Sequence, residues 1–305
     1  MIRKLNIAVL ALVASLAAGC AAGLGYNHLD WLIPWYVDGY VDLSGEQRDT
    51  LREHLEPRLE WHREEELARY VALLDGIEND LSGPVESFTV QGWAQEIIDA
   101  AVRVERNMIS AGLAFGEDMS DEQMQEFVDS LWERQREYEE EFLDRSDARY
   151  AEDDYDKLKD LLTRFMGRLS STQKEALREA SRDLERFDRA WLDERRGWLH
   201  TLEPLLLNRA EGWQQTAMVA YESRLRERTP EYHAALDHNL SRISAAFAKV
   251  IGQMTARQHK KARAELDDLR DTLHDLMRQE TTALPPRGRG RPETTTRKME
   301  CRFWA

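Results

Sequence analysis

The sequence predicts an all-α protein, an elongated and mostly antiparallel bundle of long amphipathic helices. Of its 305 residues 32% are charged, and Ala, Glu, Lys, Leu and Arg together make up about half of the chain, as in long helices and coiled coils. Ile and Val, which favour strands, total only 21. Apolar residues recur at intervals of three and four, which predicts helices that each bury one narrow stripe.

The first 19 residues are predicted to be a signal peptide. A basic start at Arg3 and Lys4 is followed by the apolar run Ile7–Ala18, which is too short to span a membrane, and then by Cys20. The small residues before this Cys resemble the lipobox of bacterial lipoproteins, although Ala17 stands where Leu is commonest. An ordinary signal peptide with an incidental Cys is the alternative.

The lipobox resemblance implies a lipid anchor. The Cys20 thiol is then diacylated, the chain is cut before it, and the new amino terminus is acylated; two or more acyl chains hold a protein stably on a membrane. Because Ala21 rather than Asp follows the Cys, the resemblance implies the inner face of an outer membrane, facing the periplasm. With Cys20 acylated, Cys301 has no partner within the chain, so no internal disulfide is expected.

Charge and composition add two expectations. The formal net charge of −15 disfavours contact with nucleic acid, so no nucleic-acid partner is expected. Residues 281–305 are rich in Pro, Gly, Thr and Arg and are predicted to form a disordered basic tail.

Residues 20–42 join the predicted anchor to the body and are rich in aromatic side chains. Trp31, Trp35, Tyr36 and Tyr40 could lie in the membrane interface, which Trp and Tyr favour, or contact a partner. They could also pack beneath the helical body as its floor. We expect packing, because acidic residues interrupt the run, namely Asp30, Asp38 and Asp42.

The predicted helical domain, residues 43–280, repeats one motif, an apolar residue, then Ser or Thr, with Gln three positions later. The Ser or Thr side chain is expected to cap a helix by accepting a hydrogen bond from the Gln N–H. The Gln side chain accepts one from the N–H of the cap, which completes a capping box. The four boxes are Ser44 with Gln47, Ser120 with Gln123, Ser170 with Gln173, and Thr255 with Gln258.

The boxes also indicate an internal duplication. LSGEQRDTLREHL from Leu43 aligns without gaps on LSSTQKEALREAS from Leu169, and each segment opens a predicted helix. The predicted halves are residues 43–168 and 169–280, with two boxes in each.

Prolines mark other expected boundaries. Pro57 is expected to kink or interrupt the first long helix, and Pro204 to start a new helix. Thr229, directly before a Pro, predicts a helix start, and residues 80–89 predict a loop in which Thr89 is a candidate cap.

Candidate chemistry is sparse. His62 and Glu66 lie four positions apart, a spacing that zinc accepts on a helix, and His233 with Asp237 repeats it. Two ligands do not complete a site, and neighbouring Arg side chains offer ordinary ion pairs, so no metal site is expected. No catalytic or nucleotide-binding motif is present, so we expect neither enzymatic activity nor a cofactor.

Several segments together resemble an uncharacterised family of Gram-negative envelope lipoproteins. They are Cys20, DWLIPWYVDGYVDLSGEQ from Asp30, Leu59–Arg63, Arg164–Gln173 and the stretch Trp191–Trp198. The resemblance spans roughly residues 10–280 and implies a helical periplasmic body with an outer-membrane lipid anchor, and no known activity.

The boxes separately resemble the Leu-Thr-x-x-Gln motif of small periplasmic stress proteins, Spy and CpxP. We therefore expect a lipoprotein attached to the membrane through its lipid anchor, which binds or scaffolds an unknown envelope protein and catalyses no reaction. The alternatives are a Spy-like holdase that shields unfolded clients and a metal-responsive envelope-stress protein.

Overall fold

The computed structural model describes residues 25–278, and within that range all regular structure is helical. The predicted all-α class is therefore confirmed. The predicted signal peptide, Cys20 and the basic tail lie outside the described residues. In the described part of the chain, no helix is both long and apolar enough to cross a membrane.

The helices follow one another with short connections. A π-helical turn, η1 (His62–Glu66), joins α4 to α5, and a 3-10 turn, η2 (Gly116–Asp118), follows α6. The α-helices are α3 (Leu29–Val37), α4 (Gly45–Trp61), α5 (Leu67–Asp80), α6 (Ser87–Phe115), α7 (Asp121–Leu143), α8 (Asp147–Met166), α9 (Ser171–Asp183), α10 (Asp188–Asn208), α11 (Trp213–Arg226), α12 (Pro230–Ile251) and α13 (Ala256–Arg278).

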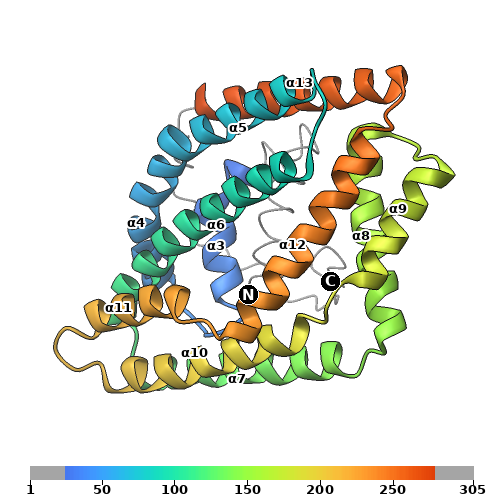
Figure 1. Ribbon diagram of the computed structural model, residues 1–305. Coiled ribbons are helices and arrows are strands. Elements are labelled where there is room, and N and C mark those ends of the chain that lie inside the picture. Colours follow the sequence, from blue (N-terminus) through green and yellow to red (C-terminus); the bar gives the residue numbers. More distant parts are fainter. Residues whose placement is uncertain (1–24, 279–305) are drawn as a thin grey trace, which may run out of the picture.

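The helices pair along opposite sides of the molecule. Figure 1 shows α5 beside α13 at the top and α7 beside α10 at the bottom, and α6 packs against α12 between these pairs. On the right of the view, α8 and α9 form a further antiparallel pair that packs on α12 and α13.

The pairing of helices repeats in the two predicted halves, 43–168 and 169–280. In each half the helix after the first box packs on the helix before the second box, as α4 does on α6 and α9 on α12. The helix after the second box packs instead on the other half, as α7 does on α10 and α13 on α5. This reciprocal exchange is the arrangement that two copies of one unit adopt in a swapped twofold dimer, and it supports the predicted duplication.

The two largest apolar clusters surround the capping boxes. One cluster contains Leu43 and Met119, the apolar residues that precede the boxes of the first half, and the other contains Leu169. All three side chains are buried. The apolar position of the motif is therefore part of the core, which explains why an apolar residue precedes each cap.

Several predicted boundaries can now be compared with the helices. Thr229 caps α12 by accepting a hydrogen bond from the Tyr232 N–H, as predicted. Thr89 lies inside α6, which begins at Ser87, so its predicted capping role is wrong.

The prediction that Pro204 starts a helix is also wrong, because α10 runs through it from Asp188 to Asn208. Pro57 lies within α4, and four residues after it, at Trp61, α4 gives way to the π-helical turn η1. Both prolines are exposed. Water can therefore bond the carbonyl that each ring leaves without a helical partner, so the helix continues.

Candidate functional site

The four capping boxes form both of their expected hydrogen bonds, and they meet in two pairs. The Gln47 Nε2 donates to Gln123 Oε1 over 2.7 Å, and the Gln123 Nε2 donates back to Gln47 Oε1 over 2.9 Å. Gln173 and Gln258 make the equivalent pair, at 3.3 and 3.0 Å. In each predicted half of the chain, one pair of Gln amides therefore joins the two capping boxes of that half.

Each Gln amide also holds the turn before its partner helix. The Gln47 Nε2 donates to the Asp118 carbonyl and the Gln123 Nε2 to the Asp42 carbonyl, both over 2.8 Å. One pair thus ties two helix starts and two turns into a single hydrogen-bonded unit. A neutral amide is neither a nucleophile nor a titrating group. The boxes therefore have a structural role, which is to hold the helix starts together.

The aromatic residues after the predicted anchor divide between surface and body. Trp31, Trp35 and Tyr36 are exposed to 50%, 58% and 58%, so the expectation that they pack beneath the body is wrong. The opposite side of α3 provides the packing, where Pro34 is buried and Val37 contacts the apolar cluster around Leu43. With these smaller side chains filling the contact, the large rings are left in solvent.

Tyr40 differs from the other three aromatic residues because it is half-buried. Its ring lies 6.0 Å from the ring of Phe127, centroid to centroid, and the Arg134 guanidinium sits over its face. Its hydroxyl hydrogen-bonds the Tyr36 hydroxyl over 2.9 Å. Tyr40 therefore joins α7 to the chain after α3.

The His62–Glu66 pair, considered above as a metal site, lies in the π-helical turn η1. The His62 ring is buried, with Nδ1 2.9 Å from the Tyr26 hydroxyl and Nε2 3.3 Å from the Tyr70 hydroxyl. Burial lowers the pKa of His62 to about 4, although the Glu66 carboxylate opposes this shift. Both ring nitrogens are engaged by tyrosines, so His62 holds Tyr26 against the body.

Glu66 is fully buried and serves an ion-pair role. Its carboxylate accepts from the Arg103 Nε over 2.6 Å and from the Arg69 Nη1 over 3.1 Å. The other candidate pair, His233 with Asp237, is exposed on α12. Within residues 25–278, no group of three or more His, Cys, Asp or Glu side chains is arranged to hold a metal ion.

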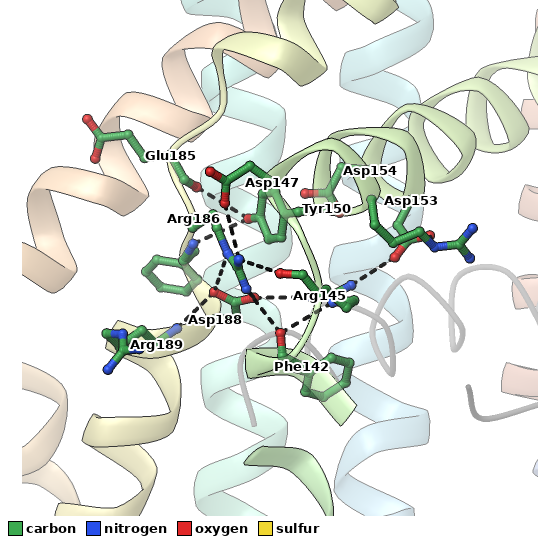
Figure 2. A network of polar contacts seen from close by, with 12 residues as sticks. Phe142, Arg145, Asp147, Tyr150, Asp153, Asp154, Glu185, Arg186, Asp188 and Arg189 are labelled. Carbon is green, nitrogen blue, oxygen red and sulfur yellow. Dashed lines mark hydrogen bonds and ion pairs between the residues drawn. The ribbon is translucent and has the colours of Figure 1, made fainter. Parts of the chain in front are cut away.

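A buried network at the junction of the two halves was not predicted. Figure 2 shows Asp188, at the start of α10, between Arg145 and Arg186. The Asp188 Oδ2 lies 2.8 Å from the Arg186 Nη2 and 3.3 Å from the Arg145 Nη2, and the Asp188 side chain is only 1% exposed. The Asp188 carboxylate raises the pKa of Arg186 by hydrogen bonding. The network therefore holds two cations on one buried anion.

The same network fastens the turn between α7 and α8 to the turn between α9 and α10 (Figure 2). Arg186 donates to the backbone carbonyls of Arg145, over 2.6 Å, and of Phe142, over 3.1 Å. Sequence reasoning missed it because an Arg and an Asp 43 positions apart carry no local pattern. An acidic residue in the first turn of a helix was the one available signal.

A second set of buried polar side chains lies between α6, α10 and α11. Burial raises the pKa of Glu105, while the Arg224 guanidinium opposes that shift. Arg224 is itself ion-paired with Glu194, with Nη2 and Oε2 2.9 Å apart. These charged side chains join three helices, since Glu105 lies on α6, Glu194 on α10 and Arg224 on α11. The sequence could not predict that the three residues lie together, because they are far apart in the chain.

The chain was also compared with known proteins. A family of unknown function, DUF6279, matches residues 39–233, a span that begins after α3 and includes three of the four boxes. Neither a curated protein nor a solved structure matches the chain. The family match covers more than half of the sequence and carries no activity with it. This chain is therefore a member of the DUF6279 family of unknown function.

Proposed function

We propose that this protein is a lipoprotein, anchored to the outer membrane and facing the periplasm, whose helical body binds or scaffolds another envelope component and catalyses no reaction. The observation that carries the proposal is the segment ending at Cys20, where a basic start, an apolar run and small residues precede the Cys. The body begins soon afterwards, since Tyr26 is already buried in an apolar cluster with Leu67 and Leu273.

The distribution of polar groups in the body supports a binding role. The buried Gln173, Glu66 and Asp188 side chains each hold helices together. None of these contacts resembles a nucleophile activated by a base. The long charged faces of the helices leave a broad polar surface for a partner.

The surface also favours a partner-binding protein over a holdase. A holdase needs extensive apolar surface for unfolded clients. Outside α3, the large apolar side chains that are exposed in the described chain are Phe88 and Val219. We therefore place the holdase second.

The anchor is tested by changing its acylated residue. Cys20→Ser is expected to move the protein from the membrane to the soluble periplasmic fraction, because no acyl group can then be attached. Intact-mass spectrometry of the wild type should show a chain that begins at an acylated Cys20. The control Cys301→Ser should remain in the membrane. A Cys20→Ser variant that stays in the membrane to the same extent as the wild type contradicts the lipid assignment.

The choice of membrane has a separate test. Ala21→Asp is expected to shift the protein from the outer-membrane to the inner-membrane band of a density gradient, because the residue after the Cys is the proposed sorting signal. An unchanged distribution contradicts outer-membrane sorting through this position. Such a result would not contradict the proposed acylation of Cys20.

The partner is best sought by crosslinking in intact cells followed by mass spectrometry. The proposal expects one or a few envelope proteins recovered at constant ratio. Protection of a denatured client from aggregation at stoichiometric ratio supports the holdase instead. Micromolar binding of zinc or copper in calorimetry supports the metal-responsive alternative.

A further inference from the structure

We propose that the exposed face of α3 lies in the headgroup region of the bilayer that holds the lipid anchor. The body is then held to the membrane at two points, so its orientation is fixed. This inference rests on the proposed lipidation of Cys20, and the experiments below separate the two.

The first argument is the short length of chain between anchor and body. Four residues lie between Cys20 and Gly25, so the chain takes five steps from one to the other, and at about 3.6 Å per extended residue this link reaches no more than about 18 Å. The body is fixed directly after it, because the Tyr26 ring is buried and its hydroxyl bonds the His62 ring. Since α3 begins at Leu29, it is held close to the bilayer surface.

The second argument is the chemistry of the exposed face. The three exposed residues of α3 are Trp31, Trp35 and Tyr36, and all are aromatic. Trp31 and Trp35 lie one turn apart with ring centroids 6.4 Å from each other and planes 10° apart. Trp and Tyr combine an apolar ring with a polar N–H or O–H group, and they are enriched where a membrane meets water.

The third argument concerns charge. None of the exposed residues of α3 is acidic, and Asp42, whose side chain is 93% exposed, lies beyond the end of the helix. The Asp38 carboxylate is 2.8 Å from the Arg48 Nε, an ion pair that lowers the cost of bringing it near lipid. Asp30 is half-buried. The exposed face of α3 therefore carries no charged side chain.

The fourth argument is an internal comparison with α8. This helix precedes the first box of the second half and packs on α9, as α3 precedes Ser44 and packs on α4. Every exposed residue of α8 other than Ala148 is polar or charged. A helix in this position can therefore pack without exposed aromatic side chains, as α8 does. Of the two helices, α3 carries such side chains, and α3 is the one beside the proposed anchor.

The test uses the acylated protein in vesicles of phosphatidylethanolamine and phosphatidylglycerol. Lipids brominated near the headgroup end of their acyl chains quench Trp that lies in the interface, and we expect them to lower the wild-type emission. This quenching should be lost in the double variant Trp31→Phe, Trp35→Phe. The matched control Trp132→Phe, Trp198→Phe removes two half-buried or buried rings on α7 and α10 and should retain the quenching. Equal quenching in both double variants overturns the proposal.

A second arm needs no lipid anchor. The unacylated Cys20→Ser protein should bind the same vesicles weakly, and Trp31→Ala with Trp35→Ala should remove most of that binding. Phe88→Ala, which removes an exposed ring from α6, should leave it unchanged. Binding that does not depend on Trp31 and Trp35 overturns the proposal.

The two proposals fail in different ways. A wild-type mass without acyl groups contradicts the lipidation of Cys20, whatever the vesicles show. An acylated wild type whose Trp31 and Trp35 are not quenched contradicts only the role of α3. Loss of a crosslinked envelope protein in the α3 variants, together with absent quenching, shows that the face serves a protein partner instead.

Discussion

At the scale of single residues, polar side chains are buried beside the apolar clusters of the body, among them His62, Glu66 and Gln173. His62 is enclosed by the hydroxyls of Tyr26 and Tyr70, and Gln173 is enclosed by backbone and by Gln258. Each such group must keep its hydrogen bonds to be tolerated inside the protein. Their replacement therefore has measurable effects on stability.

Acid is expected to destabilise the protein through His62. The pKa of His62 is lowered from 6.5 to about 4 by burial, so between these pH values the unfolded state binds a proton that the folded state does not. The free energy of unfolding therefore falls as the pH drops from 6.5 towards 4, by up to about 3 kcal/mol for this group.

Urea unfolding at several pH values measures this effect. In His62→Gln the pH dependence should be weaker than in the wild type by that amount, while His233→Gln, which changes an exposed ring, should match the wild type. Equal pH dependence in His62→Gln and the wild type contradicts the assignment.

Truncation of a paired Gln tests the boxes. Gln173→Ala is expected to lower the free energy of unfolding by about 1–3 kcal/mol, because it leaves the buried Gln258 amide without its partner. Gln47→Ala should cost less, since its pair with Gln123 is only half-buried. The exposed Gln125 on α7 is the control, and its change to Ala should stay within about 0.5 kcal/mol. A loss at Gln173 no larger than that at Gln125 would show that the pairing has no energetic role.

At the scale of elements, the helices are joined at corners by charged networks. The corner between α9 and α10 has no side-chain cap at Phe187, and Asp188 anchors it through Arg145 and Arg186 instead. The start of α10 is thereby tied to the end of α7. At this corner Arg145 of the first predicted half is ion-paired with Asp188 of the second.

Removal of Asp188 should weaken the corner strongly. Asp188→Ala leaves two Arg side chains without their shared buried anion, which typically costs about 3–5 kcal/mol. Asp147→Ala removes a carboxylate that also contacts Arg186 but whose side chain is 90% exposed, so a change below about 1 kcal/mol is expected. Chemical unfolding of both variants compares the two. Similar losses would mean that burial of the anion is unimportant.

At the scale of the whole molecule, the two halves complete each other. α5 of the first half packs on α13 of the second, and α7 of the first half packs on α10 of the second. Each half alone therefore leaves two amphipathic helices without the partners that cover them. The duplication predicted from the boxes remains a prediction, and this exchange of helices supports it.

The exchange predicts that the first half does not fold alone. Residues 43–168, expressed by themselves, should lack a cooperative unfolding transition as a monomer, because the apolar stripes of α5 and α7 are then exposed to water. Circular dichroism with sedimentation analysis tests this at low concentration, with the full chain as the control. A cooperatively folded monomer contradicts the arrangement, whereas assembly into a twofold dimer agrees with it.

The four helix starts and the helical class could be predicted because they depend on residues close together in the chain. A cap such as Ser44 bonds the N–H three residues later, and a helical stripe repeats every three or four residues. Pro204 was misjudged because a Pro is favoured at a helix start and disfavoured inside one, whereas the packing of α10 on α7 and α11 keeps this helix continuous through it.

The sequence by itself thus determined where the helices that follow the four boxes begin and which of their faces are apolar. Only the tertiary structure decided that Gln47 meets Gln123, 76 positions away, that Asp188 meets Arg145, and that Trp31 and Trp35 stay in solvent. Caps and stripes are local interactions that each segment forms on its own. Pairing and exposure depend on which distant segments pack together, and that choice is made by the whole chain when its apolar stripes find partners.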